Sequence, residues 1–418
     1  MGTGKKIRVG VFGAYRGMTM INVLARHPEA ELVAVCDKYT PLLDKCRKLA
    51  EETGSSITYY EDFDSFFNHD MDAVVLANYA NEHALFAIRL LMSGRHVVSE
   101  VLPVETMGQA VALAEAVEQS GKVYAYAENY CYFPATQEMK RLYREGAIGE
   151  FMHGEGEYVH DCEAIWPSIT YGESDHWRNR SYSTYYCTHS FGPIISITGT
   201  RPVRVVGFES RPVENMTSKG FSGGTSGMIV AQMSNGATVK SLNGHLKREP
   251  SAIWYSIYGE KGMIESDRWN EGVSRVNLFK EGDSLTATEV SYRPRPIVDT
   301  KLAKLTSTHG GGDFYTMHYF LEKILERPSG EQCIDVYQAL DMGLPGILAF
   351  RSICGGNIPI EMPDFRDKVI REKYRNDNWC TNPAVAGNNL APFNSFGNVS
   401  IPNSVYKKVR ETWEAGEK

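Results

Sequence analysis

The segment Lys6-Ile7-Arg8-Val9-Gly10-Val11-Phe12-Gly13-Ala14-Tyr15-Arg16-Gly17 decides the fold class of this chain. Its first part predicts a short buried strand, and Gly13-Ala14-Tyr15-Arg16-Gly17 predicts a turn into a helix. After that helix, residues 31–36 (ELVAVC) predict a second strand, which ends at Asp37. A strand, a glycine turn, a helix and a second strand closed by an acid together predict a dinucleotide-binding fold.

The same turn indicates how a nucleotide binds. Gly13 and Gly17 let backbone N–H groups approach a pyrophosphate at the helix N-terminus, where the helix dipole favours an anion. Asp37 is expected to accept hydrogen bonds from the adenosine ribose, which favours NAD over a 2′-phosphorylated cofactor. Because the turn is one residue and one glycine shorter than G-x-G-x-x-G, the prediction depends on the flanking elements, and a bare α/β turn is the alternative.

A length of 418 residues and a net charge of −7 limit the classes of protein. The length suggests two domains, and 42% hydrophobic residues are typical of a soluble globular protein. The acidic balance argues against a nucleic-acid groove or an anionic membrane surface as a partner, and no stretch is apolar for long enough to span a bilayer. The eight cysteines are scattered without a C-x-x-C pair, which predicts reduced thiols and a cytoplasmic protein.

Strands and helices alternate up to residue 128 and predict an α/β fold with an N-terminal Rossmann domain, a doubly wound parallel sheet over residues 1–128. Beyond about residue 150, β-rich runs and a Ser-Asn-Gly turn at 234–236 predict an open, mainly antiparallel sheet. This sheet belongs to a C-terminal α+β substrate and oligomerisation domain over residues 129–366. Residues 367–418 predict an irregular tail. Helices are expected at 41–53, 82–94, 105–120, 313–326 and 335–352, and strands at 72–77, 96–99, 123–127, 151–159, 203–209, 228–233, 238–243 and 254–258.

In open α/β sheets, ligands gather at the carboxyl ends of the strands. The residues that follow the predicted strands, Asp37, Asn78, Glu100 and Glu128-Asn129, are therefore expected around one crevice. The predicted cofactor-binding residues are Phe12, Gly13, Ala14, Tyr15, Arg16, Gly17, Asp37, Lys38, Asn78, Tyr79, His83, Glu100, Val101, Glu128 and Asn129.

Three clusters carry groups suited to chemistry. Glu100 can fix a ribose or a substrate hydroxyl, with a surface acid as the alternative reading. Tyr132, in Glu128-Asn129-Tyr130-Cys131-Tyr132, can exchange a hydrogen bond with a substrate oxygen, with a packed tyrosine as the alternative. In Tyr185-Tyr186-Cys187-Thr188-His189, the imidazole suits removal of a hydroxyl proton as hydride leaves the same carbon, with a structural histidine as the alternative.

Two further patterns are weaker. His160-Asp161-Cys162 and Asp175-His176 lack the convergent spacing of metal ligands, so no metal is predicted. His309-Gly310-Gly311-Gly312-Asp313 can cradle an anion, or it can serve as a flexible connection with Asp313 as the N-cap of the helix that follows.

At this point the motifs become recognisable. Residues 5–366 resemble the Gfo/Idh/MocA family of nicotinamide-dependent sugar enzymes, and most of all its NAD-dependent glycosidases, typified by bacterial α-N-acetylgalactosaminidases. The matching segments are 128–132, 149–161, 186–193 and 309–314. Dehydrogenases of the family have Glu-Lys-Pro where this chain has Glu100-Val101-Leu102-Pro103, and an Asp where it has Tyr185. Both differences match the glycosidases, whose Tyr-Pro-Thr-His motif is Tyr186-Cys187-Thr188-His189 here; the cysteine marks a divergent member.

The resemblance implies a redox-neutral hydrolysis of a glycoside with a tightly bound, recycled NAD: oxidation at C3, loss of the aglycone after removal of the C2 proton, addition of water and re-reduction. It implies that His189 and Tyr186 serve C3 and C2, and that Tyr132 and Glu100 hold the sugar or assist proton transfer. The expected substrate-binding residues are Tyr130, His160, Trp177, Arg178 and Tyr185.

The resemblance also implies a homo-oligomer, a dimer or tetramer formed through the open second sheet. Two other functions stay open from the sequence. One is an NAD-dependent sugar 3-dehydrogenase that stops at the ketone, and the other is a nucleotide-binding sensor without catalysis.

Overall fold

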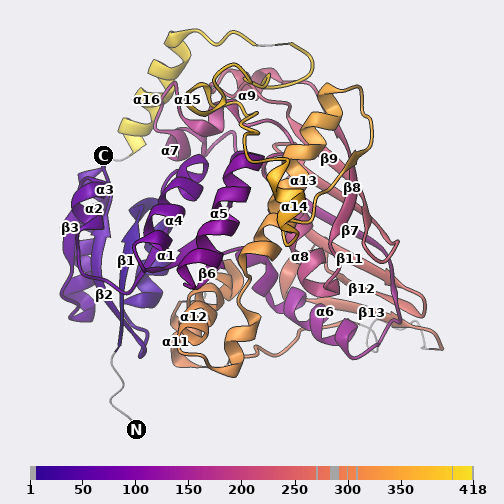
Figure 1. The fold of residues 1–418 in the computed structure, drawn as a ribbon, viewed down its shortest axis with the longest axis horizontal. Helices are drawn as coiled ribbons and strands as arrows, with labels where there is room; N and C mark the ends of the chain where they lie inside the picture. The colour runs from indigo at the N-terminus through magenta and orange to yellow at the C-terminus, as the bar shows by residue number, and fades with distance from the viewer. Residues whose placement is uncertain are drawn as a thin grey trace. The chain divides into compact units, whose positions relative to one another are not determined.

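The computed structural model of this protein describes residues 6–269, 272–282, 291–298, 300–306, 309–397 and 399–416. The chain divides into two compact units, and Figure 1 follows it through them by colour. Unit 1 comprises Met1–Pro134, Arg295–Leu340 and Phe365–Arg375, and unit 2 comprises Ala135–Pro294, Asp341–Asp364 and Asn376–Lys418. Each unit thus takes up segments from both sides of the boundary that the sequence predicts near residue 366.

Unit 1 contains, within the described residues, a parallel sheet with the strand order β3-β2-β1-β4-β5-β6. The order reverses at β1, which is the doubly wound arrangement that the sequence predicts. Strand β3 and helix α3 are additional to the predicted elements. The strands are β1 (Ile7–Phe12), β2 (Ala30–Cys36), β3 (Thr58–Tyr60), β4 (Ala73–Leu76), β5 (His96–Ser99) and β6 (Tyr124–Tyr126), and the helices between them are α1 (Ala14–Leu24), α2 (Thr40–Thr53), α3 (Phe63–Phe67), α4 (His83–Met92) and α5 (Met107–Ser120).

Segments from far along the chain complete unit 1. Helix α12 (Gly312–Ile324) lies against α1, where Nε2 of His27 and Nδ1 of His318 are 3.2 Å apart. The backbone N–H of Tyr126 in β6 donates to the carbonyl of Ile334 at 2.9 Å. The other helices with residues in unit 1 are α11 (Lys301–Leu305), α13 (Val336–Cys354), which continues into unit 2, and α14 (Lys368–Glu372), together with the 3₁₀ helices η1 (Ala80–Glu82), η2 (Asn129–Tyr132), η5 (His309–Gly311) and η6 (Pro328–Gln332).

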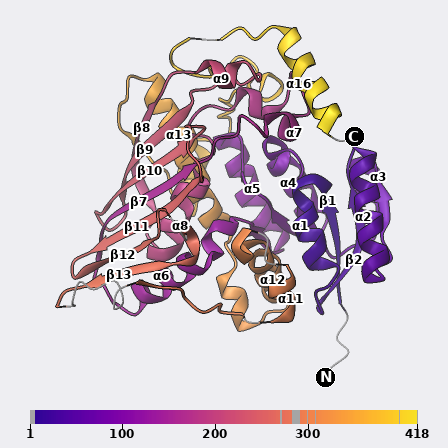
Figure 2. The ribbon, with the colours of Figure 1, turned by 180° about the vertical axis from the view of Figure 1, so that it is seen from behind.

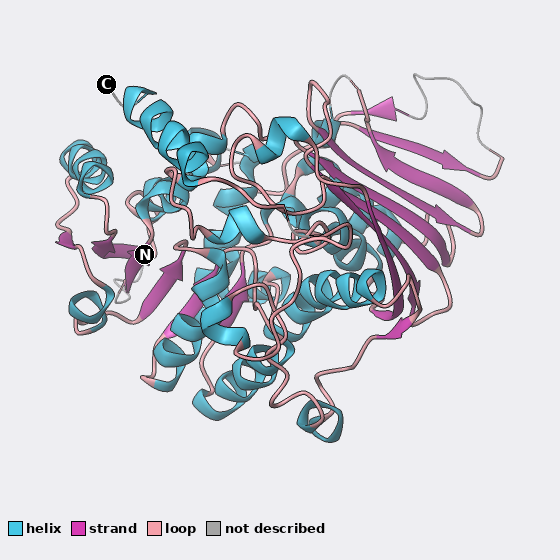
Figure 3. Cartoon of the chain, turned by 90° about the horizontal axis from the view of Figure 1, so that it is seen from above, coloured by secondary structure: helices cyan, strands magenta, loops and turns pink. Residues whose placement is uncertain are grey.

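The described part of unit 2 contains a mixed sheet with the strand order β14-β13-β12-β11-β7-β10-β9-β8-β15 (Figure 2). Its neighbours pair antiparallel except β7 and β10, which pair parallel. The predicted turn at residues 234–236 joins β9 to β10, and the predicted fold class is confirmed. The strands, drawn as arrows in Figure 3, are β7 (Phe151–Val159), β8 (Pro202–Glu209), β9 (Ser226–Met233), β10 (Thr238–Gly244), β11 (Ala252–Gly259), β12 (Gly262–Ser266), β13 (Val276–Lys280), β14 (Ser291–Tyr292) and β15 (Ile360–Glu361).

The C-terminal tail differs from the irregular segment that the sequence predicts. It contains α14, α15 (Pro383–Ala386) and the 14-residue helix α16 (Asn403–Gly416). Helix α16 lies on α7 (Trp166–Thr170), where the rings of Tyr171 and Trp413 are 5.3 Å apart. The remaining helices of unit 2 are α6 (Pro134–Arg144), η3 (Trp177–Arg180), α8 (Thr188–Thr198), α9 (Glu214–Thr217) and η4 (Gly272–Ser274). Among the described helices, none has both the length and the apolar character needed to cross a membrane.

Helix α8 lies directly on the sheet of unit 2 because β7 carries glycines on its inner face. A Cβ at Gly156 would collide with the carbonyl oxygen of Ser190 in the first turn of α8, and a Cβ at Gly154 would lie 3.2 Å from Ile194 Cγ2. Glycine in a strand interior weakens the strand but permits such an approach. The sequence His153-Gly154-Glu155-Gly156-Glu157 thus sets how close the helix comes to the sheet.

We therefore expect Gly156→Ala to destabilise the protein. The added methyl has to displace helix backbone, and overpacking of this kind lowers the free energy of unfolding by about 1–3 kcal/mol. Thermal and urea unfolding of the full chain measure the loss. Gly416→Ala is the matched control, because a Cβ there meets nothing within 4 Å. Equal stability of the two variants would contradict the close approach of α8 to β7.

Candidate active site

The glycine turn of unit 1 is built around a backbone conformation that favours glycine. Gly13, the N-cap of α1, has φ +98°, and a Cβ on it would collide with the carbonyl of Ala77. Its N–H donates to the carbonyl of Cys36 at 2.8 Å. A Cβ on Gly17 would lie 3.0 Å from Val11 Cγ1, so this glycine lets α1 pack closely on β1. The shortened turn keeps both functions of the dinucleotide-binding glycines.

Asp37 closes this turn from the end of β2. Its Oδ2 accepts a hydrogen bond from the Ala14 N–H at 2.7 Å, and its Oδ1 accepts one from the Tyr39 N–H at 2.8 Å. Burial raises the pKa of Asp37 above its ordinary value, although both backbone donors act in the opposite direction. Each carboxylate oxygen has a second lone pair, so the side chain is held in place and can still accept from a ribose hydroxyl.

Buried acceptors without a partner mark the end of β4. Oδ1 of Asn78, Oδ1 of Asn81 and Nε2 of His83 are buried and have no hydrogen-bond partner among the described residues. Nδ1 of His83 lies 3.0 Å from the carbonyl of Leu102, so it donates and leaves Nε2 as an acceptor. Burial lowers the pKa of His83 to about 4, which keeps the ring neutral. An unsatisfied buried acceptor costs about 1–3 kcal/mol, and a ligand with hydroxyl or amide donors would remove that cost.

The other residues predicted to bind the cofactor also lie in unit 1. The Lys38 Nζ is 4.6 Å from the ring centre of Tyr79, and Tyr15 is 45% exposed. Phe12 packs in an aromatic cluster with Phe63 and Phe86. Val101 and Glu128 are buried. Together with the turn, Asp37 and the acceptors beside β4, these residues fit a dinucleotide at the carboxyl edge of the sheet.

A buried ion-pair network lies at the ends of β5 and β6. Nη2 of Arg16 donates to Oε1 of Glu100 at 2.8 Å and to Oδ1 of Asp313 at 2.7 Å. Asp313 also accepts from Nδ2 of Asn129 at 3.0 Å and lies 2.7 Å from Nδ1 of His309. Burial alone would raise the pKa of Asp313, but the His309 hydrogen bond and the Arg16 charge hold that pKa well below its ordinary value. The predicted role of Asp313 as an N-cap is wrong, because Gly311 occupies the N-cap position of α12.

The tyrosines that follow β6 are packed within unit 1. The Tyr132 hydroxyl donates to the carbonyl of Gln332 at 2.8 Å, and its ring lies against Tyr315 and Tyr319. Burial raises the pKa of Tyr132 well above its ordinary value. Tyr130 is buried and its ring lies 4.6 Å from that of Phe133. These contacts are those of packed side chains, and the roles predicted for Tyr132 and Tyr130 stay predictions.

The second group of predicted residues forms an aromatic cluster in unit 2. His189, the second residue of α8, has its ring centre 5.1 Å from Tyr186 and 4.8 Å from Tyr158 of β7, both in edge-on arrangements. The rings of Tyr158 and Tyr186 are 6.1 Å apart. The hydroxyl of Tyr158 lies 3.1 Å from Nδ1 of His160. Two phenols and two imidazoles thus share one small volume, and the sequence did not single out Tyr158.

Trp177 and Arg178 extend this cluster. The Trp177 ring stacks on Tyr186 with centres 6.3 Å apart, and the Tyr185 ring lies edge-on to Trp177 at 6.3 Å. The guanidinium of Arg178 lies 4.5 Å from the centre of Trp177 and 5.5 Å from that of Tyr186. Cation–π contacts of this kind hold a guanidinium without neutralising its charge. The structure therefore brings Tyr185, Tyr186, His189, Trp177 and Arg178 together, and the roles predicted for them stay predictions.

His160 and His245 support the cluster from one side. Burial, followed by the charges of His189 and Arg178, lowers the pKa of His160. Nδ1 of His245 lies 3.3 Å from the carbonyl of His160, and its ring packs on Trp166 and Phe221. Burial lowers the pKa of His245 to about 4. Both rings are therefore neutral near pH 7.

Several contacts fix the first turn of α8. The Tyr255 hydroxyl in β11 donates to the carbonyl of His189 at 2.6 Å, and the hydroxyls of Ser190 and Ser241 in β10 are 2.7 Å apart. Cys187 is buried, with its Sγ 3.6 Å from the carbonyl of Met342, so it is packed rather than presented to a substrate. Within the described ranges, no group of three or more His, Cys, Asp or Glu side chains is placed to hold a metal ion.

Comparisons with known proteins agree with the cofactor prediction. Residues 7–128 match the Gfo/Idh/MocA model, described as an oxidoreductase family with an NAD-binding Rossmann fold. This confirms the predicted resemblance and NAD as the cofactor of this domain.

Curated relatives span most of the chain. A protein of Bacteroides thetaiotaomicron named glycosyl hydrolase family 109 protein 1 is 24% identical over 398 residues, which cover 86% of this chain and 84% of the relative. A glycosyl hydrolase family 109 protein of Streptomyces coelicolor is 26% identical over 404 residues, which cover 88% of this chain and 84% of the relative.

Solved structures share the fold. A levoglucosan dehydrogenase in complex with NADH has a TM-score of 0.68 at 16% identity and covers 86% of this chain and 100% of that chain. The scyllo-inositol dehydrogenase of Lactobacillus casei, solved with NAD(H) and scyllo-inositol, has a TM-score of 0.65 at 18% identity and covers 85% of this chain and 99% of that chain.

Burial of His245 predicts a loss of stability in acid. Its pKa is about 4 in the folded protein and 6.5 in an unfolded chain, so below pH 6.5 the unfolded state binds a proton that the folded state does not. The free energy of unfolding should fall between about pH 6.5 and pH 4, by up to about 3 kcal/mol for this residue. His245→Asn retains a donor for His160 but does not titrate, and should show a smaller fall.

Urea unfolding from pH 7.5 to pH 4 measures this difference. Phe221→Leu is the control, because it disturbs the packing around His245 without removing the titrating ring. It should lower stability at every pH and keep the acid dependence of the parent protein. The prediction fails if His245→Asn and the parent lose the same stability over this range.

Proposed function

We propose that this chain is an NAD-dependent glycoside hydrolase that oxidises its sugar transiently and returns it without net redox change. The pairing of Tyr186 with His189 carries the proposal. A dehydrogenase needs one group to take the proton of the reacting hydroxyl, whereas elimination needs a second to take the proton from the neighbouring carbon. The phenol of Tyr186 and the imidazole of His189, whose ring centres are 5.1 Å apart, can supply these two groups. The relatives named glycosyl hydrolase family 109 support the same class of substrate.

The absence of a lysine at position 101 also supports the proposal. Dehydrogenases that the chain resembles have a lysine there, and this chain has Val101, which is buried. A buried valine cannot hold or move a proton at the reacting hydroxyl. We therefore assign both proton transfers, from the C3 hydroxyl and from C2, to His189 and Tyr186 in unit 2.

NAD⁺, when bound, supplies the hydride acceptor for C3 and later the hydride donor. The turn from Gly13 to Gly17 would hold its pyrophosphate, Asp37 its adenosine ribose, and Asn78 and His83 would accept hydrogen bonds from its nicotinamide half. His189 removes the proton of the C3 hydroxyl.

Tyr186, as the phenolate, would remove the C2 proton, which the C3 ketone makes acidic. The C1–O bond to the aglycone then breaks with its electron pair, so the aglycone leaves and the C1–C2 double bond of the enone forms. The Tyr158 hydroxyl lies 3.1 Å from Nδ1 of His160, so these two groups would exchange a proton with each other beside Tyr186. The aromatic face of Trp177 packs against the sugar, as tryptophan does in many sugar sites, and Arg178 donates to its oxygens. Addition of water to the enone and reversal of the first two steps return the hydrolysed sugar.

His189→Ala should retain NAD and lose turnover by at least about 10²-fold, because general-base catalysis contributes about 10²–10⁴-fold. Tyr186→Phe should behave in the same way, since it removes only the hydroxyl. Tyr143→Phe in α6 is the control and should turn over normally. A screen of aryl α- and β-glycosides measures turnover, and chromatography of the denatured protein measures bound NAD. Near-normal turnover by His189→Ala would remove this residue from the reaction.

Turnover in deuterated water separates the hydrolase from its alternatives. The hydrolase should release a sugar labelled at C2, work with the nucleotide that co-purifies, and accumulate no NADH. Accumulation of NADH with an intact glycosidic bond would instead identify a sugar 3-dehydrogenase. A complete lack of turnover across the glycoside panel, with NAD bound, would favour a sensor.

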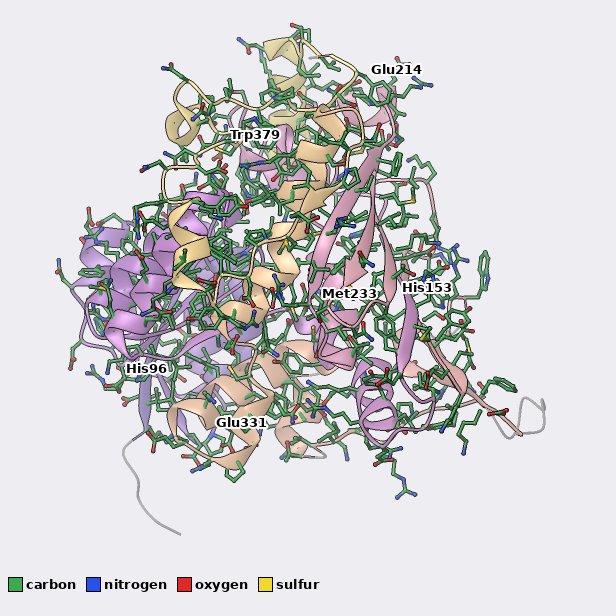
Figure 4. All side chains as sticks on the ribbon, turned by 45° about the vertical axis from the view of Figure 1, so that its right-hand side comes forward. His96, His153, Glu214, Met233, Glu331 and Trp379 are labelled. Atoms are coloured by element: carbon green, nitrogen blue, oxygen red, sulfur yellow. The ribbon has the colours of Figure 1, made fainter. Side chains whose placement is uncertain are left out.

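We further propose that a second copy of the chain covers the outer face of the unit 2 sheet. Phe208 and Val230 on β8 and β9, and Tyr258 on β11, are each about 40% exposed or slightly more on this face. His153, labelled in Figure 4, lies on the same face opposite Tyr258. Apolar side chains gathered on one sheet face are typical of a subunit contact.

The pair Phe208→Glu and Val230→Glu should therefore convert an oligomer into a monomer, because it buries charge in the contact. Light scattering on a size-exclusion column measures the mass. Phe396→Glu, at a site that is 60% exposed in the tail, is the control and should leave the mass unchanged. A monomeric parent protein would contradict the proposal.

A further inference from the structure

Asp313 contacts two of the residues predicted to bind the cofactor, although it belongs to a motif that the proposed reaction does not use. Arg16 lies in the glycine turn and Asn129 follows β6, and both donate to the carboxylate of Asp313. Glu100, which follows β5, accepts from the same guanidinium. These three residues stand at the carboxyl ends of three strands, which is where a doubly wound sheet binds its ligand.

Arg16 and Asp313 form a bidentate interaction, here called the fork, in which two guanidinium nitrogens contact the two carboxylate oxygens. Nη2 of Arg16 donates to its Oδ1 at 2.7 Å and Nη1 lies 3.3 Å from its Oδ2, while Nη1 also donates to Oγ1 of Thr19 at 2.7 Å. The Asp313 side chain is fully buried and that of Glu100 is 7% exposed, whereas Arg16 is 28% exposed. The Arg16 guanidinium is thus held by ion pairs with two buried carboxylates, those of Glu100 and Asp313.

The glycines before Asp313 explain how its carboxylate reaches this position. A Cβ on Gly312 would lie 2.5 Å from the carbonyl oxygen of Asn129, and Gly310 and Gly311 have φ of +60° and +87°. The glycine run therefore brings the start of α12 against the chain that leaves β6. This is a tight backbone contact, and it differs from the flexible connection considered from the sequence.

We propose that Asp313 is a positioning residue of the NAD site. It holds the Arg16 guanidinium in the nucleotide-binding turn, orients the amide of Asn129 and, through Arg16, fixes the carboxylate of Glu100. An arginine side chain loses rotamer freedom when it is ordered, and here that loss occurs on folding rather than on binding. Arg16 also neutralises carboxylate charge beside a site for an anionic pyrophosphate.

The test measures NAD⁺ binding to the full chain after its resident nucleotide is removed with charcoal. Asp313→Asn keeps the shape of the side chain and lacks the charge, so Arg16 loses its fork, and we expect NAD⁺ to bind at least tenfold more weakly. Glu322→Gln is the matched control. Glu322 is a buried carboxylate nearer the other end of the same helix, and it accepts from Arg327 and Ser329. Its variant should bind NAD⁺ within about twofold of the parent.

A double-mutant cycle shows whether Asp313 acts through Arg16. Arg16→Gln should weaken NAD⁺ binding, and Arg16→Lys, which keeps the cation, should recover part of that loss. Adding Asp313→Asn to Arg16→Gln should weaken binding by less than about threefold more, because the partner is already gone. The amount of NAD that co-purifies with each variant gives a second measurement without removal of the nucleotide.

Three results would overturn the proposal: parental affinity in Asp313→Asn, equal losses in Asp313→Asn and Glu322→Gln, or additive losses in the double variant. Equal losses would mean that Asp313 serves only the stability of α12, which thermal unfolding of the same variants measures. Because the readout is NAD⁺ binding, a failure of the proposed glycosidase activity leaves this test valid.

Discussion

The close approach of the Ser190 carbonyl to Gly156 sets the geometry of the aromatic cluster in unit 2. His189 is next to Ser190, and Tyr158 lies two residues beyond Gly156 on the same side of β7, so the depth of α8 fixes the distance between imidazole and phenol. Three strands contact the first turn of α8. Gly156 lets β7 pack closely against it, the Tyr255 hydroxyl in β11 donates to it, and Ser241 in β10 forms a hydrogen bond with Ser190. The imidazole of His189 is therefore positioned by contacts with the sheet, and the base proposed here would have to come within about 3 Å of the hydroxyl that it deprotonates.

Periodicity predicted the parallel sheet well, because its strands are continuous apolar runs that end at polar residues. Strand β3 covers only Thr58–Tyr60 and α3 only Phe63–Phe67, and elements this short carry no recognisable period. In the second sheet the β-rich runs were found, but the parallel pairing of β7 with β10 was not, since the order of strands depends on contacts between distant segments. Helix α16 was missed because the Asn- and Pro-rich chain before it suggested an irregular tail.

The sequence indicates candidate site residues where polar side chains follow strands, as at Asp37 and Glu100, and where titratable groups gather in a short segment, as at Tyr186–His189. Their roles stay predictions. Tyr158 was not singled out, because a tyrosine within a strand is an ordinary β-forming residue until a neighbour gives it a hydrogen bond. For the motif that ends at Asp313, the sequence leaves open an anion cradle or a flexible connection with Asp313 as an N-cap, because Arg16 and Asn129, which donate to Asp313, lie far away in sequence. The motif itself was visible, but the direction of its carboxylate depends on backbone conformation at three glycines.

Arg16 and Asp313 are 297 positions apart in the chain, and this separation has a consequence for how the protein is made. Synthesis runs from the N-terminus, so the six strands of the unit 1 sheet leave the ribosome long before α12 and Ile334 do. Until those segments are made, Arg16 lacks the carboxylate of Asp313, and the Tyr126 N–H of β6 lacks the carbonyl of Ile334 to which it donates. Of the described strands of unit 2, all but β15 are already present by then. Unit 1 is thus begun first but completed only after most strands of unit 2 have been made. A nascent chain arrested before residue 313 would carry the nucleotide-binding turn without the carboxylate that holds Arg16.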